Sequence, residues 1–160
     1  MDVIRAAKLH ELVGLLNDAI ESCRELTQGE SFASGGDLQA ALQNLASKIT
    51  SVVPCEIVCR ENVSLINPES GRQVYRIALE AIENALKFSH ASCIRMGLMQ
   101  ANDLVTFEIF DNGMGFEPDE KTDGLGLQNM YFCAETLKGS LRIESKAGDG
   151  TKVICTFPNI

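Results

Sequence analysis

Residues 72–89 read RQVYRIALEAIENALKFS, and this stretch has the strongest helical periodicity in the chain. At ~100° per residue, its apolar side chains cover more than half of a helix surface. They are Val74, Ile77, Ala78, Leu79, Ala81, Ile82, Ala85 and Leu86. The remaining polar stripe is narrow, and Glu80, Asn84 and Lys87 share one line of it at spacing i, i+4, i+7. The pattern predicts a largely buried helix with one polar edge.

This polar edge has two interpretations. A carboxylate, an amide oxygen and an ammonium in line can orient water, ligate a hard cation and meet a phosphate. A solvated face with a Glu83–Lys87 ion pair is the simpler interpretation, and such a pair contributes only ~0.3–0.5 kcal/mol. On the helix alone we favour the solvated face, so the choice depends on the rest of the chain.

The segments on either side supply the other elements of the fold. Helices are predicted over residues 4–26 and 38–49 (the second capped by Asp37) and over 125–137. Strands are predicted over residues 55–60, 93–99, 104–110, 140–145 and 151–157, and a turn over 67–71. Because the strands come mostly in consecutive pairs, we expect an α+β sandwich. Its mixed, mostly antiparallel sheet would be covered on one face by helices, with a helical extension at the N-terminus.

Composition excludes several classes of protein. The 160 residues include 14 basic and 22 acidic side chains, a net charge of −8, which argues against a nucleic-acid partner. No apolar run reaches the ~18 residues that a membrane span needs. The six cysteines form no C-x-x-C pair, and two histidines cannot complete a zinc site with them. Reduced, buried thiols are therefore expected, and a cytoplasmic location with them.

Two glycine-containing segments follow the strand over residues 104–110. Residues 110–116 read FDNGMGF, and Asn-Gly is a signal for a tight hairpin turn. No strand follows directly, so a carboxylate beside a ligand-binding loop is the alternative, with Asp111 accepting from a ligand amine. Residues 123–130 read DGLGLQNM and open a helix, where unpaired N–H groups can bind an anion or merely end a loop. Residues 148–151, GDGT, would alone be a β-turn.

Each motif is weak alone, but their order and spacing are specific. Asn84 in a helix, then Asp111-x-Gly113-x-Gly115, Gly124-x-Gly126 and Gly150-Thr151, resembles the N, G1 and G2 boxes of the GHKL (Bergerat-fold) ATPases. The sequences of residues 75–87, 124–130 and 139–145 are similar to those of the catalytic ATP-binding domain of sensor histidine kinases, in the nitrate-sensor and thermosensor subgroup. The resemblance implies a Bergerat-type α/β sandwich over 31–160, and the end of a dimerisation helix over 1–30.

The resemblance also implies a role for each matching residue toward ATP and Mg²⁺. Asp111 would accept the adenine amino group, and Gly113 and Gly115 would let the loop approach the purine. Asn84 would ligate Mg²⁺, with Lys87 adding positive charge near the phosphates. Glu80 aligns with a carboxylate that orients water in hydrolytic members of the superfamily.

The remaining implied roles belong to the second glycine segment and the last strand. The nucleotide would be bound by Gly124, Leu125, Gly126 and Leu127, whose two glycines free backbone amides for the phosphates. Thr151 would close the base pocket through its hydroxyl, and residues 117–122 would form a short lid.

Two positions depart from the family pattern. Phe88 stands where the subgroup has a histidine after the lysine of its N box, so the resemblance implies no phosphate contact at this position. No phosphoacceptor box is found, because the segment around His10 matches the end of the second dimerisation helix. His10 is therefore expected to be a surface residue.

The resemblance implies a protein histidine kinase fragment. It would transfer the γ-phosphate of ATP to a histidine on a dimerisation helix outside this chain, and from there to the receiver domain of a response regulator. A homodimer would form through those helices. Two alternatives stay open: a degenerate GHKL module that docks without catalysis, which Phe88 favours, and an anti-sigma-type serine kinase.

Overall fold

The structure is a computed structural model that describes residues 37–51, 53–59, 63–117 and 124–160, together with Val3, Ala7, His10, Glu11 and Gly14. These isolated N-terminal positions are helical and exposed, as expected for His10. The rest of the helix predicted over 4–26, and the lid predicted over 117–122 beyond Glu117, lie outside the described residues. No helix in the described part of the chain has the length and apolar character needed to cross a membrane.

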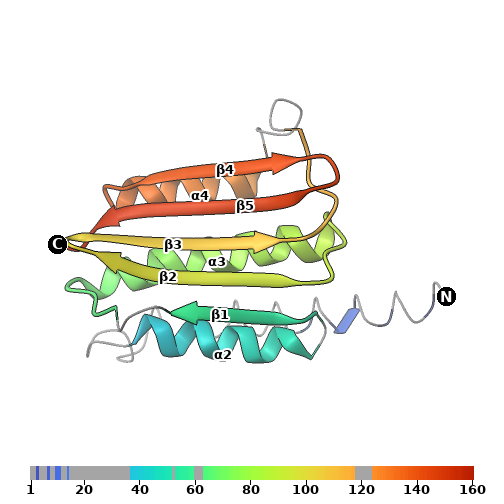
Figure 1. Cartoon of the computed structure of the whole chain (residues 1–160), viewed down its shortest axis with the longest axis horizontal. Helices are drawn as coiled ribbons and strands as arrows, with labels where there is room; N and C mark the ends of the chain where they lie inside the picture. The colour runs from blue at the N-terminus through green and yellow to red at the C-terminus, as the bar shows by residue number, and fades with distance from the viewer. Residues whose placement is uncertain are drawn as a thin grey trace.

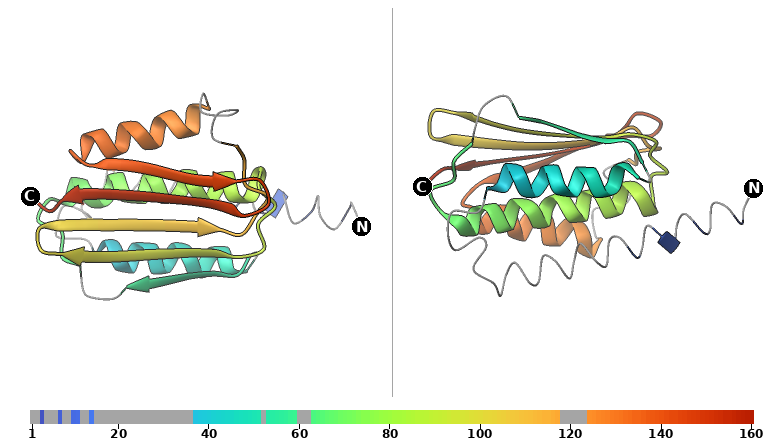
Figure 2. Two further views of the ribbon diagram at one scale, coloured as in Figure 1. Left: turned by 45° about the horizontal axis from the view of Figure 1, so that its top comes forward. Right: turned by 90° about the horizontal axis from the view of Figure 1, so that it is seen from below.

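In chain order, the described elements are a helix and a strand, followed twice by a helix and a pair of strands. They are α2 (Leu38–Thr50), β1 (Cys55–Cys59), α3 (Pro68–Lys87), β2 (Ile94–Ala101), β3 (Leu104–Asp111), α4 (Leu125–Thr136), β4 (Ser140–Lys146) and β5 (Gly150–Pro158). The strands form a five-stranded sheet in the order β1-β2-β3-β5-β4, and the three helices cover one of its faces (Figures 1 and 2). β1 and β2 are parallel, with α3 as their crossover, and the other neighbours are antiparallel. The predicted α+β sandwich with a mixed, mostly antiparallel sheet is confirmed.

The core lies between the three helices and the inner face of the sheet, and α3 contributes the most buried residues to it. Ile77 and Ile82 of α3 are fully buried, as are Leu98 of β2, Phe107 of β3 and Cys155 of β5. The apolar stripe that predicted this helix is the stripe that packs on the sheet. Burial of this apolar surface is the dominant favourable contribution to folding.

The start of α3 corrects one prediction. Residues 67–71 do not form a separate turn, because Asn67 caps the helix and Pro68 occupies its first position. The Asn67 side chain accepts a hydrogen bond from Glu69 N at 3.0 Å. Asparagine and proline are as suitable for a helix start as for a turn, so the sequence pattern did not separate the two.

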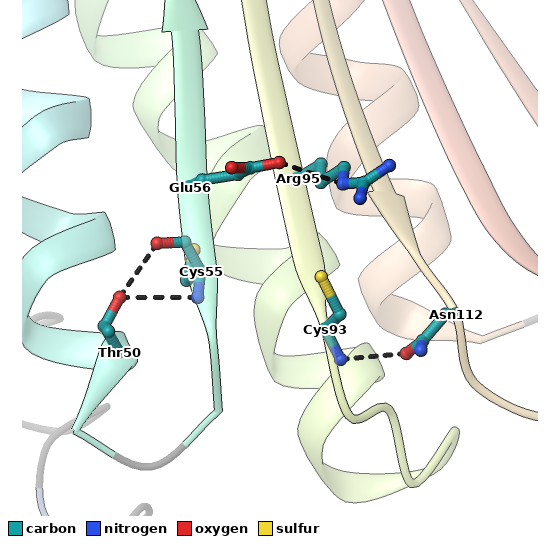
Figure 3. Close-up of polar contacts among 6 residues, drawn as sticks. All are labelled: Thr50, Cys55, Glu56, Cys93, Arg95 and Asn112. Carbon is teal, nitrogen blue, oxygen red and sulfur yellow. Dashed lines mark hydrogen bonds and ion pairs between the residues drawn. The ribbon is translucent and has the colours of Figure 1, made fainter.

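Side-chain contacts join the ends of neighbouring elements (Figure 3). Thr50 Oγ1 at the end of α2 donates to Cys55 O at 2.8 Å, and Arg95 of β2 forms an ion pair with Glu56 of β1 at 2.9 Å. Asn112 Oδ1 accepts from Cys93 N at 2.8 Å, so the side chain that follows β3 holds the entry to β2. Asn112 therefore does not form the tight hairpin turn that Asn-Gly can signal.

Candidate functional site

A pocket of about 520 Å³ lies at the end of the sheet where β3 stops and β5 begins. Its walls come from α3, α4 and the inner face of β3, β4 and β5. Eight of the residues predicted for a binding site line it: Asn84, Asp111, Gly115, Gly124, Leu125, Gly126, Leu127 and Thr151. The other three, Glu80, Lys87 and Gly113, are not among its lining residues.

The Asp111 carboxylate is a buried polar group of the pocket, and two hydrogen bonds fix its orientation. Asp111 is the last residue of β3, and only 7% of its surface is exposed. Its Oδ1 accepts from Ser89 Oγ at 2.6 Å and from Gly113 N at 2.9 Å. No described residue donates to its second oxygen, Oδ2. A carboxylate held in this way presents one fixed acceptor to a ligand.

Ser89 is a site residue that the sequence did not reveal. It follows the end of α3, lines the pocket and reaches an aspartate 22 residues further along the chain. Its backbone oxygen also accepts from Met114 N at 2.8 Å. No spacing rule connects these positions, because they meet only when α3 packs against β3.

Glycine is required at residues 113 and 115 for packing against protein, whereas the family resemblance implied that it would let the loop approach a purine. At Gly113 a Cβ atom would overlap the Ser89 hydroxyl and carbonyl oxygens. Gly115 has φ +61°, and a Cβ there would meet Lys146 O and, at 2.7 Å, Gly150 O. The loop is thus packed against protein at both positions, and glycine is required for that close approach.

Thr151 lies beside Asp111 on the neighbouring strand. The two residues are partners in the β3–β5 register, and Thr151 lines the pocket. Its Oγ1 lies 2.9 Å from Ser145 Oγ on β4, which also accepts from Phe116 N at 2.9 Å. Ser145 is a second hydroxyl that sequence reasoning missed, since its partners come from two other segments.

The other end of the pocket combines the polar edge of α3 with the start of α4. A Cβ at Gly126 would lie 2.5 Å from Glu80 Oε2 and 3.8 Å from Asn84 Oδ1. Gly124 caps α4 without a side-chain hydrogen bond, so among the described residues no side chain caps the first-turn N–H groups of this helix. Amide groups at a helix start favour an anion.

Glu80 and Lys87, the two charged residues of the predicted polar line, lie in different surroundings. Burial, and next the neighbouring Glu83, raise the pKa of Glu80, while a hydrogen bond with Asn129 and the charge of Lys87 lower it. Lys87 is exposed and forms an ion pair with Glu83, as the simpler interpretation of this edge predicted.

The apolar walls complete the pocket. Ala81 and Ala85 of α3, Ile109 of β3, Met130 of α4, Ile143 of β4 and Val153 of β5 line it. Phe88 lines its margin, and 65% of the Phe88 surface is exposed. A flat apolar ring with one polar edge matches this combination of walls and acceptors.

Comparison with protein families matches residues 69–159 to the histidine kinase-, DNA gyrase B-, and HSP90-like ATPases. This match covers more than half of the chain. The chain belongs to this family. Membership in a family of ATPases implies that the domain binds ATP.

Curated relatives within this family are named as histidine kinases. The chain is 36% identical over 86 residues to the signal transduction histidine-protein kinase/phosphatase DegS of Brevibacillus brevis. It is 36% identical over 87 residues to the oxygen sensor histidine kinase NreB of Staphylococcus carnosus. Each alignment covers 53% of this chain, but only 22% of DegS and 25% of NreB. These names do not favour the docking-module or serine-kinase alternatives.

Solved structures of the family share the fold. A histidine kinase domain from Erythrobacter litoralis EL346 matches with a TM-score of 0.61 at 19% identity, over 77% of this chain and 61% of that one. Full-length ShkA, solved in complex with AMPPNP, matches with a TM-score of 0.60 at 22% identity, over 76% of this chain and 29% of that one. The sandwich predicted from the sequence is therefore the fold of this ATPase family.

Proposed function

We propose that this chain is the ATP-binding catalytic domain, over residues 31–160, of a sensor histidine kinase. The whole protein would transfer the γ-phosphate of ATP to a histidine on a dimerisation helix, and from there to the receiver domain of a response regulator. That acceptor helix would lie outside this chain, and residues 1–30 would be the end of the second dimerisation helix. The kinase would act as a homodimer in the cytoplasm. The observation that carries the proposal is the second oxygen of Asp111, to which no described residue donates, at the inner end of an apolar pocket.

The adenine ring would occupy this inner end. Asp111 would accept a hydrogen bond from the exocyclic amino group, and Ile109 and Val153 would contact the ring. Thr151 lies beside Asp111 and would contribute its hydroxyl. A buried acceptor that loses its donor costs ~1–3 kcal/mol, which is enough to select one base.

The phosphates would extend toward the start of α4. Backbone amides of residues 124–127 would contact phosphate oxygens there, as anions at helix starts do. The Asn84 side chain lines this end, and no described residue forms a hydrogen bond with it.

Mg²⁺ fits the residues at this end. No group of three His, Cys, Asp or Glu residues in the described ranges could hold a metal by itself. Mg²⁺ does not need one, because it usually keeps several waters and is held by one or two protein oxygens together with phosphates. Asn84 Oδ1 would be that protein ligand. Glu80 lies close enough to Gly126 to orient a metal-bound water, and Lys87 would add charge at the margin.

Calorimetric titration with Mg·ATP tests this proposal. Wild-type protein should bind saturably, and Asp111→Asn should bind at least about tenfold more weakly, because an amide can turn a donor toward the adenine amine. Asn84→Ala should lose only the part of the affinity that depends on Mg²⁺. Asp103→Asn and Asn44→Ala, the same substitutions at exposed positions outside the pocket, serve as matched controls.

The outcome that would overturn the proposal is equally direct. If folded wild-type protein binds no Mg·ATP, or if Asp111→Asn binds as tightly as Asp103→Asn, this pocket is not the nucleotide site.

A further inference from the structure

Three polar side chains lie in a row across neighbouring strands at the inner end of the pocket. Asp111 of β3 is the register partner of Thr151 of β5, and Thr151 is in turn the partner of Ser145 of β4. Asp111 and Thr151 line the pocket, whereas Ser145 is not among its lining residues. Ser145 can therefore act on a ligand only through the lining residues that it contacts, and Thr151 is the one whose side chain it touches.

The contacts of the Ser145 hydroxyl determine the direction of each hydrogen bond. A hydroxyl has one hydrogen to donate and two lone pairs that accept. Ser145 Oγ accepts from Phe116 N at 2.9 Å and lies 3.0 Å from Gly150 O, which can only accept. Its single hydrogen therefore points to Gly150 O. The contact of 2.9 Å with Thr151 Oγ1 is then satisfied only if Thr151 donates.

Thr151 consequently has no hydrogen left for the pocket and presents lone pairs to it. The Ser89 hydroxyl likewise has no hydrogen left for a ligand. Its single hydrogen is directed to protein acceptors, Asp111 Oδ1 at 2.6 Å and Ala85 O at 3.1 Å. The second oxygen of Asp111 is also an acceptor. The inner end of the pocket thus places two acceptors side by side, with neither hydroxyl free to donate.

We propose that Ser145 is a positioning residue that fixes the Thr151 hydroxyl as an acceptor, so that the pocket selects a ring carrying an amino group over a ring carrying a keto oxygen. The two N–H groups of one amino group would then satisfy Asp111 and Thr151 together. This inference rests on the proposed function, in which the pocket binds a nucleoside triphosphate.

Calorimetry with ATP and with inosine triphosphate, which has a keto oxygen in place of the amino group, tests the inference. In Ser145→Ala the Thr151 hydroxyl can rotate and donate to the keto oxygen. The ratio of the inosine triphosphate Kd to the ATP Kd should therefore fall about threefold to tenfold, the range expected for one hydrogen bond. Ser140→Ala, at an exposed position of the same strand, should leave the ratio unchanged.

A double-mutant cycle separates positioning from a structural role. In a Thr151→Val background, Ser145→Ala should no longer change the ratio, because there is no hydroxyl left to orient. A structural role alone would weaken both nucleotides equally and leave the ratio as it is in wild type, which would overturn the inference.

The outcomes also distinguish the inference from the proposed function. A folded wild-type protein that binds neither nucleotide refutes both. ATP binding with an unchanged ratio in Ser145→Ala refutes only the role of Ser145. If Ser145→Ala does not fold, Thr151→Val alone decides: it should weaken ATP binding more than inosine triphosphate binding, and an equal loss for both would refute the inference.

Discussion

At Gly113, the space that a side chain would need is taken by Ser89. A Cβ there would overlap both a side-chain and a backbone oxygen of Ser89, so removing the hydroxyl alone cannot relieve the contact. We expect Gly113→Ala to lower the free energy of unfolding by ~1–3 kcal/mol, as overpacked sites do, and to weaken nucleotide binding by displacing Asp111. Urea unfolding measures the first effect and calorimetry the second.

The matched control for this substitution is Gly14→Ala. Gly14 is exposed and helical, with nothing within 4 Å of an added Cβ, so alanine there should be neutral or slightly stabilising. Equal stability of the two variants would mean that residues 112–116 shift without cost.

Two cysteine residues make the free energy of unfolding depend on pH. Burial raises the pKa of Cys155 to about 12, and burial with smaller contributions from Cys93 and Glu56 raises the pKa of Cys55 to about 11. Both folded-state pKa values lie above the ordinary 9.0, so the stability linked to these thiols is fully present below pH 9. It is lost as the pH rises through the folded values.

Alkylation by iodoacetamide, followed by mass spectrometry, checks this expectation. At pH 8.5 both residues should be modified far more slowly in native protein than in urea, because the thiolate reacts and burial disfavours it. Labelling of native Cys155 at the unfolded rate would contradict the buried environment.

At the scale of elements, Asn159 ties the end of β5 to the segment that leads into α3. Its Oδ1 accepts from Ile66 N at 2.9 Å, and its Nδ2 donates to Ser64 O at 2.9 Å. Asn159 is only 8% exposed, so Asn159→Ala leaves these backbone groups without partners. We expect a loss of ~1–3 kcal/mol in urea unfolding and faster hydrogen exchange at Ile66.

Asn44→Ala on the exposed face of α2 is the control for this element contact. If both variants unfold at the same urea concentration, solvent replaces the Asn159 contacts without cost.

The elements also show what sequence patterns can and cannot predict. The apolar stripe of α3 and the alternation in β3 and β5 were readable because each depends on neighbours within one segment. The start of α3 was missed because Asn67-Pro68 suits both a turn and a helix cap. Ser89 and Ser145 were missed because their hydrogen-bond partners come from other strands and loops, which only the packed fold brings near.

At the scale of the whole molecule, the pocket couples ligand binding to folding. Its walls come from α3, α4 and three strands, so unfolding any of these elements destroys it. Mg·ATP at a hundred times its Kd should therefore raise the free energy of unfolding by ~2.7 kcal/mol. Thermal unfolding with and without Mg·ATP measures this increment. At the same Mg·ATP concentration, Asp111→Asn should lose about half of the increment or more, and Asp103→Asn should retain it.

The order of the strands has a consequence for synthesis on the ribosome. β5 is the last described strand in the chain, yet it lies between β3 and β4 and is the only described strand paired with β4. Until residues 150–158 have left the exit tunnel, β4 has no strand to join and the pocket lacks Thr151 and Val153. The nascent domain must therefore wait with an open edge on β3 and complete its sheet and its pocket in one late step.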